Sequence, residues 1–261
     1  AFVHAGPFGN ISHGNSSVIA DLSALRLADF VVTESGFGSD LGAEKFFNIK
    51  CRANGLRPDA EVLVCTVRAI KFHSGQFEVR PGRPLPDALL RADLRALKAG
   101  IKNVSGHLAH LRAYGIPVVV AINQFPTDTA AELKLLRAEL LELGVGHVAQ
   151  TSAFSEGSEG SLDLADAVID ACSSATRFQS LYALESSYQQ KIERIAMHAY
   201  GADGVEFYEG VADQLDDLGR RGYGNLPVCI AKTQYSLSHD PKKLGRPTGF
   251  KLPVREVRLA A

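Results

Sequence analysis

Short apolar runs alternate with longer helical patterns along almost the whole chain, and this alternation restricts the fold more than any other feature. The runs are mostly continuous, which is typical of strands covered on both faces of a parallel sheet. We expect strands at residues 2–4, 29–35, 61–67, 117–123, 147–152, 205–208 and 227–233. Helical patterns lie between them, at residues 15–27, 41–52, 86–113, 128–143, 161–172, 181–200 and 209–222. This order predicts an α/β fold, with a wound, mostly parallel sheet and flanking helices.

One long loop interrupts the pattern. Residues 73–87, "HSGQFEVRPGRPLPD", cluster Pro and Gly, as expected of an insertion between two α/β lobes. We therefore place a domain boundary there, with a first domain at 1–75 and a second at 76–261. The chain opens at Ala1 on a strand-like stretch and closes on the strand-like "LPVREVRLAA". Because the termini of an intact domain usually lie at its surface, we expect a piece of a longer protein.

Charge and composition exclude several functional classes. The 28 Lys and Arg residues balance the 29 Asp and Glu residues, so the chain lacks the basic excess of a nucleic-acid partner. No apolar run approaches the ~18 residues that cross a bilayer, so we expect no membrane partner. The cysteines are scattered and form no CxxC, which favours reduced, buried thiols of a cytoplasmic protein over disulfides or metal ligands: Cys51, Cys65, Cys172 and Cys229.

Glycine-rich and polar segments follow the predicted strands, where open α/β sheets bind ligands. In "GFGSDLG", residues 36–42, the third glycine is displaced by one from the dinucleotide fingerprint. A tight strand-to-helix turn therefore explains the segment as well as a nicotinamide site does. The opening loop "HAGPFGNISHGNSS", residues 4–17, lets backbone N–H groups approach a phosphate, but no G-x-x-x-x-G-K-[ST] occurs in the chain.

Metal binding is a second possible function of the opening loop. A metal site would use His4 and His13, with His73 as a third ligand. Their spacing matches no zinc pattern, and no cysteine lies nearby. Ordinary hydrogen-bonded loop histidines explain them better, and we expect no metal site.

Basic residues also lie near the ends of strands and helices: Lys50, Arg52, Arg68, Lys71 and Lys232. For each one alone, solvated surface charge is the favoured interpretation. Arg68 and Lys71 can also face an anion, because both follow the strand predicted at 61–67.

Two aromatic residues, Phe125 and Phe154, follow the neighbouring strands predicted at 117–123 and 147–152. Aromatic rings on adjacent loop tips can sandwich a flat heterocycle by stacking. Packing of the rings beneath their own loops is an equally good interpretation of the pattern alone.

At these residues the sequence resembles formate–tetrahydrofolate ligase along essentially its whole length. The blocks that carry the resemblance occur in order: "FVHAGPFGNISHGNSSVIAD", "VVTESGFGSDLGAEKFFNIKCR", "TVRAIKFHSG", "PVVVAINQFPTDT", "YGADGVEF", "GYGNLPVCIAKTQYSLSHDPKKLGRPTGF" and "VREVRL". The family uses ATP to join formate to tetrahydrofolate, giving 10-formyltetrahydrofolate, ADP and phosphate through formyl phosphate. The resemblance implies a P-loop-NTPase-like fold in truncated form, ATP with Mg²⁺ as co-substrate, a monovalent cation, and a homo-oligomer in the intact enzyme.

The resemblance also implies roles for residues on a folate side. Phe125 of "NQFPTD" matches an aromatic residue that stacks on the folate pterin, and Pro126 follows it. Phe154 falls where the family often has tryptophan, the other half of that sandwich. Gln150 lines the same cleft. A phenylalanine keeps the flat apolar face but loses the indole N–H, so stacking survives with lower strength.

On the nucleotide side, Phe37 of "GFG" resembles the phenylalanine that contacts adenine, with Gly38 beside it. The opening loop resembles part of the nucleotide-side wall, through Pro7, Phe8 and Asn10.

The chain also departs from the family pattern. The P-loop with its lysine and threonine, and the arginine that holds formyl phosphate, have no counterpart here, so the chain resembles roughly the middle half of the enzyme. We expect a portion of the ligase with little or no activity alone. A non-catalytic folate- or nucleotide-binding module, such as a regulatory paralogue, is the alternative. A nicotinamide oxidoreductase using "GFGSDLG" is the weaker third hypothesis.

Overall fold

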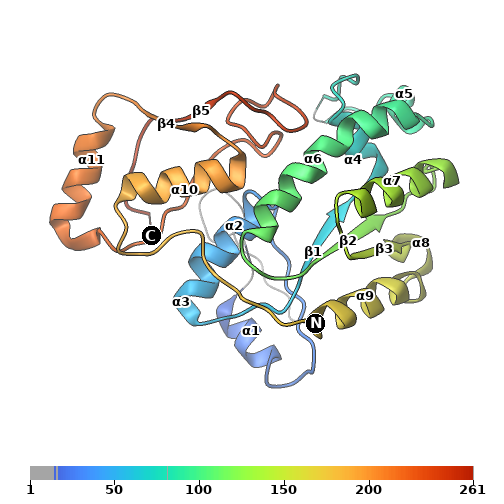
Figure 1. The fold of residues 1–261 in the computed structure, drawn as a ribbon, viewed down its shortest axis with the longest axis horizontal. Helices are drawn as coiled ribbons and strands as arrows, with labels where there is room; N and C mark the ends of the chain where they lie inside the picture. Colours follow the sequence, from blue (N-terminus) through green and yellow to red (C-terminus); the bar gives the residue numbers. More distant parts are fainter. Residues whose placement is uncertain (1–14, 16, 81, 261) are drawn as a thin grey trace. The chain divides into compact units, whose positions relative to one another are not determined.

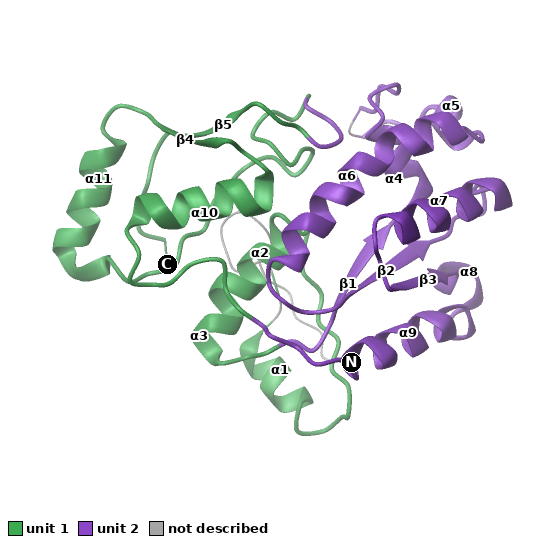
Figure 2. Cartoon of the chain, viewed as in Figure 1, with its two compact units in different colours: residues 1–57, 179–242, 247–261 green, residues 58–178, 243–246 purple. Residues whose placement is uncertain are grey.

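A computed structural model describes residue 15 and residues 17–80 and 82–260, which belong to two compact units (Figure 2). Unit 1 comprises residues 1–57, 179–242 and 247–261, and unit 2 comprises residues 58–178 and 243–246. The boundary placed between residues 75 and 76 falls inside unit 2, so it does not coincide with the division between the units.

Unit 2 is built on a three-stranded parallel sheet with strand order β1-β2-β3, flanked by helices (Figure 1). Its strands are β1 (Glu61–Cys65), β2 (Val118–Asn123) and β3 (His147–Thr151). Its helices are α4 (Val67–Phe72), α5 (Asp87–Leu90), α6 (Leu94–Arg112), α7 (Ala130–Glu142), α8 (Ala153–Glu156), the 3₁₀ turn η2 (Glu159–Ser161) and α9 (Leu162–Cys172). The predicted α/β class with parallel strands is confirmed.

The central strand β2 explains why its sequence is a continuous apolar run. Val120 and Ile122 belong to the core that α4, α6 and α7 complete. Val119 and Ala121 point to the other face of the sheet and are equally inaccessible, with α9 packed beside β2 and β3. Burial on both faces removes the polar alternation that a half-exposed strand shows.

Helix ends in unit 2 follow their capping residues more closely than the apolar pattern. The helix expected at 86–113 divides into α5 and α6, because the Asp93 side chain accepts the Ala96 N–H at 2.8 Å and starts a new helix. Thr129 and Glu132 form a capping box at the start of α7. Residues 76–80 and 82–86 have no regular secondary structure, as expected of the long loop.

Helices α4 and α6 approach each other closely at Gly100. A Cβ atom on Gly100 would lie 1.7 Å from the carbonyl oxygen of Ile70, a backbone atom that cannot move without shifting α4. Glycine is therefore required at this position by packing.

We expect Gly100→Ala to lower the free energy of unfolding by about 2 kcal/mol, a typical cost of inserting extra atoms into a packed core. Urea denaturation followed by circular dichroism measures the change. Gly146→Ala is the matched control, because a Cβ there meets no atom within 4 Å and Gly146 is not among the glycines with positive φ. Equal effects of the two substitutions would contradict the close packing of α4 on α6.

Unit 1 combines helices with a two-stranded parallel sheet, in which Gly204 pairs with Lys251 and Phe207 with Val254. Its elements are α1 (Val18–Ala24), the continuous helical segment α2 (Gly42–Lys45), η1 (Phe46–Cys51) and α3 (Arg52–Asn54), then α10 (Tyr188–Tyr200), β4 (Gly204–Phe207), α11 (Val211–Leu218), η3 (Gly219–Tyr223) and β5 (Lys251–Val254). Its main core packs α10 against β4 and β5, through residues that include Ile195, Tyr200, Phe250 and Leu252.

Two predicted strands of unit 1 are wrong. Residues 29–34 form no ladder, and only Ser35 makes an isolated bridge, with Asn15. Val32 in this run is 87% exposed. Residues 227–233 are also irregular, since the Val228 N–H donates to the Tyr182 hydroxyl at 3.1 Å instead of to a neighbouring strand. The apolar side chains of this second run pack against the unit 1 core without strand pairing.

Other predicted boundaries in unit 1 shift. Helix α10 begins at residue 188 rather than 181, because Ser187 and Gln190 form a capping box there. The strand predicted at 2–4 lies outside the described residues. Cys51 and Cys65 are buried, as expected, whereas Cys172 is half-buried and Cys229 is exposed.

Candidate functional site

The carboxyl edge of the unit 2 sheet gathers the segments that follow its three strands. Thr66 and α4 follow β1, the loop 124–129 follows β2, and α8 follows β3. Parallel strands present these ends at one edge, which is where open α/β sheets bind ligands.

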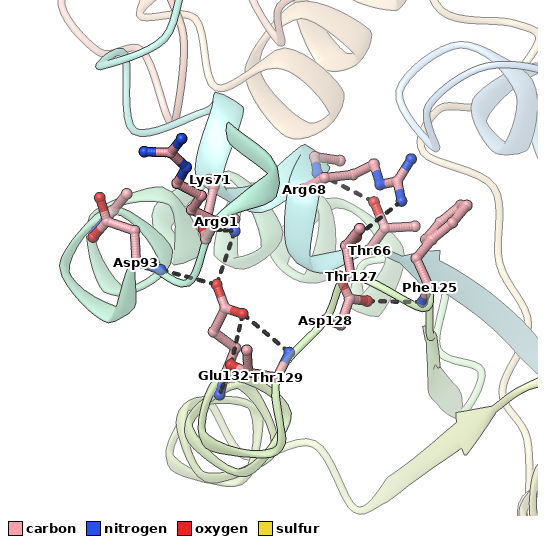
Figure 3. A network of polar contacts seen from close by, with 12 residues as sticks. Thr66, Arg68, Lys71, Arg91, Asp93, Phe125, Thr127, Asp128, Thr129 and Glu132 are labelled. Carbon is pink, nitrogen blue, oxygen red and sulfur yellow. Dashed lines mark hydrogen bonds and ion pairs between the residues drawn. The ribbon is translucent and has the colours of Figure 1, made fainter. Parts of the chain in front are cut away.

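Arg68 lies directly over the ring of Phe125 (Figure 3). The guanidinium carbon is 3.5 Å from the ring centroid, and an Arg68 Nη2 donates to the Thr127 hydroxyl at 3.4 Å. A cation this close to an aromatic face is attracted by the ring quadrupole. Arg68 is half-buried, so it is only partly the solvated surface charge that was predicted, and its guanidinium packs on an aromatic ring.

Hydrogen bonds fix the loop that carries Phe125. The Gln124 N–H donates to the carbonyl of Thr151 at the end of β3. The Phe125 N–H donates to Asp128 Oδ2, and the Asp128 N–H returns to the Phe125 carbonyl, both at 2.9 Å. Burial raises the pKa of Asp128, against the lowering effect of the Phe125 N–H and of Arg68.

A buried ion pair is connected to the same loop, because its Glu132 binds Thr129 at the end of the loop. Lys71 Nζ lies 2.8 Å from Glu132 Oε1, and both side chains are almost inaccessible. Glu132 Oε1 also accepts the Asp93 N–H, while Oε2 accepts the Thr129 N–H and hydroxyl (Figure 3). Burial alone would raise the pKa of Glu132, but these hydrogen bonds outweigh it and hold the pKa below its usual value. Lys71 is thus a structural cation, and both predictions for it, surface charge and anion binding, are wrong.

Gln150 lies near the end of β3, at the same edge of the sheet. Its Nε2 donates to Gln124 Oε1 at 2.6 Å, so the two glutamines join the ends of β3 and β2. Gln150 also lines a cavity of about 610 Å³ with Ser152, Gly160 and several acidic residues: Glu156, Glu159, Asp163 and Asp166. Arg137 also lines this cavity, so its wall carries four acidic side chains and one basic side chain.

In unit 1, the "GFGSDLG" segment forms a tight turn that leads into α2. The Gly38 carbonyl accepts the N–H groups of Leu41 and Gly42, both at 3.0 Å. A Cβ on Gly42 would lie 2.2 Å from the Gly36 carbonyl oxygen, so this glycine is explained by the close return of the turn. Residues 29–34 form no strand before it, so the strand that a dinucleotide fingerprint requires is missing here.

Phe37 is the single non-glycine residue with positive φ among the described residues, at 60°, and its side chain is 59% exposed. A left-handed backbone costs an L-residue about 1–2 kcal/mol. The turn holds the ring outward despite this cost.

Buried charge fills the interior of unit 1 next to this turn. Lys232 Nζ pairs with Asp40 Oδ2 at 2.6 Å, and Lys50 pairs with Asp21. Lys50 and Lys232 were expected at the surface, and both are buried. Arg52 donates to the Tyr182 carbonyl at 2.7 Å and lies over the Tyr182 ring.

Glu44 is fully buried between these charges. Its Oε1 accepts from the Asn48 amide at 3.0 Å, and Oε2 has no hydrogen-bond partner. Burial raises the pKa of Glu44 to about 7, although Lys45 and the Asn48 hydrogen bond act in the opposite direction. No sequence pattern considered above marked this carboxyl group.

Comparison with known proteins identifies the family. A family model described as formate–tetrahydrofolate ligase matches residues 1–261. The chain belongs to the formate–tetrahydrofolate ligase family. The formate–tetrahydrofolate ligase of Saccharopolyspora erythraea is 52% identical over 256 residues, covering 98% of this chain and 45% of that protein. That of Aeromonas hydrophila is 51% identical over 259 residues, covering 99% and 45%.

A relative from Schizosaccharomyces pombe, named C-1-tetrahydrofolate synthase, cytoplasmic, is 47% identical over 274 residues, covering 100% of this chain and 29% of that protein. The chain therefore spans less than half the length of these members of the ligase family. The predicted resemblance is confirmed.

The residues that the ligase family implies for folate all lie at the unit 2 edge. Phe125 is half-buried, and Pro126 and Gln150 are exposed. Phe154 lies on α8 and is 89% exposed, so it does not pack beneath its own loop. Phe37 and Gly38 lie in the unit 1 turn, whereas Pro7, Phe8 and Asn10 fall outside the described residues.

No group of three or more His, Cys, Asp or Glu side chains among the described residues is arranged to hold a metal ion. His73 accepts the Gly245 N–H at Nδ1, whereas His4 and His13 are not described. No described helix is long and apolar enough to cross a membrane.

Proposed function

We propose that this chain forms part of an ATP-dependent ligase that makes 10-formyltetrahydrofolate from formate, ATP and tetrahydrofolate through formyl phosphate. The observation that carries the proposal is the pair of rings, Phe125 and Phe154, on the segments that follow the adjacent strands β2 and β3. Membership of the ligase family supports folate as the heterocycle that these rings bind. Pro126 and Gln150 would border the same site.

We propose a nucleotide contact for Phe37. Strained backbone conformations concentrate at functional sites, and here the strain holds an aromatic ring outward. An exposed ring can stack on adenine. Gly38 would let the backbone approach the same nucleotide.

Within these 261 residues no G-x-x-x-x-G-K-[ST] supplies the lysine that neutralises a transferred phosphate. The described residues also include no group of three or more His, Cys, Asp or Glu side chains arranged to hold a metal ion. We therefore propose that the chain binds substrates without completing the reaction alone. Its described residues would orient the pterin and the adenine.

Calorimetry with tetrahydrofolate tests the folate site. We expect Phe125→Ala to weaken binding about 5- to 150-fold, the range found when an aromatic stacking partner is removed. Phe77→Ala, in the irregular segment 76–80, is the control and leaves the affinity unchanged. Unaltered affinity in Phe125→Ala would remove the basis for the stacking site.

The alternative function is a non-catalytic folate- or nucleotide-binding module. An assay of the isolated chain with formate, MgATP and tetrahydrofolate should yield no 10-formyltetrahydrofolate, because no residue replaces the missing lysine. Product formation at the rate of an intact ligase would contradict this expectation. If a separate polypeptide that carries the P-loop motif restores activity, the chain is part of a ligase; if none does, the binding module is favoured.

A further inference from the structure

Hydrogen bonds within the protein fix the backbone of Phe125, so the orientation of its ring is the remaining freedom. The Gln124 N–H is bonded to β3, and the Phe125 N–H and carbonyl are both bonded to Asp128. A ring on such a loop still turns about its side-chain bonds. Ordering the ring when a flat ligand binds costs conformational entropy and weakens binding, unless another group has already fixed the ring.

Arg68 is placed to fix that ring. It belongs to the first turn of α4, where the Thr66 side chain accepts the Ala69 N–H at 3.2 Å. One turn later, the buried Lys71–Glu132 pair ties α4 to α7. The base of the Arg68 side chain is therefore anchored on both sides.

The guanidinium packs against the ring and forms no ion pair with a described acid, although its charge lowers the pKa of Asp128. No ion pair within the described part of the chain involves Arg68, and its Nε is buried without a hydrogen-bond partner. Its one hydrogen bond to a side chain there is the 3.4 Å contact with Thr127. The 3.5 Å approach to the ring centroid covers one face of Phe125.

We propose that Arg68 is a positioning residue that holds the Phe125 ring and reserves its opposite face for the pterin, an inference that rests on the folate site proposed above. A cation on one face draws π density toward itself. The opposite face then favours an electron-rich heterocycle, because stacking improves when the two π systems differ in charge distribution. In tetrahydrofolate the N5 and N8 amines of the saturated ring donate electrons into the remaining aromatic pyrimidine ring, which is therefore richer in electrons than the oxidised pterin of folate, so Arg68 would favour the reduced form.

The test compares variants of the full 261-residue chain by calorimetry with tetrahydrofolate and with folate. Arg68→Met keeps an apolar side chain but removes the charge. Arg68→Lys keeps the charge but removes the planar guanidinium that lies over the ring. We expect Arg68→Met to weaken tetrahydrofolate binding about five- to thirtyfold and folate binding less, with Arg68→Lys intermediate. Arg95→Met, an exposed residue on α6, is the control and changes neither affinity. Circular dichroism and thermal unfolding check that each variant is folded.

The outcomes separate the two proposals. If the unaltered chain binds neither pterin, or if Phe125→Ala binds both as well as the unaltered chain does, the folate site itself fails and the role of Arg68 with it. If Phe125→Ala weakens binding while Arg68→Met does not, only the role of Arg68 is overturned. Equal losses for tetrahydrofolate and folate in Arg68→Met would likewise overturn it, because a purely structural role affects both pterins alike.

Discussion

Glu132→Gln is expected to destabilise the chain by about 3–5 kcal/mol, because it leaves the Lys71 ammonium buried without a counter-charge. Glu132 is fully buried and also accepts the Asp93 N–H and two donors from Thr129. A glutamine can replace only part of this acceptor set. Urea denaturation followed by circular dichroism measures the loss.

A matched control lies on the same helix. Glu139 of α7 pairs with Lys98 at 3.1 Å, but the Lys98 side chain is 68% exposed. Exposed pairs contribute about 0–1 kcal/mol, so Glu139→Gln should have a small effect. Adding Lys71→Met to Glu132→Gln should recover part of the loss, since no buried ammonium then remains. Equal effects of Glu132→Gln and Glu139→Gln would show that the buried pair is not the source.

The same carboxylate gives a pH dependence of defined sign. Because the folded pKa of Glu132 is lower than its ordinary value, the unfolded chain takes up the proton first on acidification. The stabilisation is complete above the ordinary pKa of 4.5 and is lost as the pH falls through the folded pKa.

Glu44 should produce the opposite dependence in unit 1. Its pKa is raised by burial from 4.5 to about 7, so between these values the folded chain holds a proton that the unfolded chain has released. Its contribution to stability is complete below pH 4.5 and is lost as the pH rises through 7. A shift of this size corresponds to about 3 kcal/mol.

Glu44→Gln tests this expectation by removing the titration while keeping the shape. The variant should match the unaltered chain at pH 4.5 and exceed its free energy of unfolding by about 3 kcal/mol at pH 8.5. Glu193→Gln, on the exposed side of α10, is the control substitution. The difference between variant and unaltered chain isolates Glu44 from Glu61, a half-buried acid whose pKa desolvation raises to about 8. A parallel pH profile for Glu44→Gln would refute the assignment.

The parts of the fold that were predicted from the sequence are those where one local signal decides the structure. Strand β2 is a continuous apolar run between helices, and burial on both faces accounts for it, whereas β1 leaves Val64 60% exposed and β3 includes the exposed Gln150. The run at 227–233 is also largely apolar but forms no strand, and its Val228 N–H donates to the Tyr182 hydroxyl. Whether an apolar run finds a partner strand depends on residues far away in the sequence, which periodicity does not report.

The candidate site shows the same limit. The positions of Phe125 and Phe154 after adjacent strands were predicted, because strand order places both at one edge. The partners of Lys71 and Arg68 were not, since Glu132 is 61 residues away from Lys71 and Phe125 is 57 residues away from Arg68. The T-x-x-E pattern at Thr129–Glu132 is a local signal of helix capping that marks Glu132 as ordered. It does not reveal which lysine the carboxylate meets.

The division of unit 1 into distant segments has a consequence for synthesis on the ribosome. Residues 58–178 of unit 2, including all three of its strands, emerge before the second half of unit 1 has been translated. Strand β4 has no partner until β5 has been translated, and the helical segment 42–54 is made before α10 and the buried Lys232. At about 5–20 residues per second, the stretch from 179 to 254 takes roughly 4–15 s to appear. During this interval the early half of unit 1 is exposed to chaperones and proteases, whereas the unit 2 sheet can already be protected.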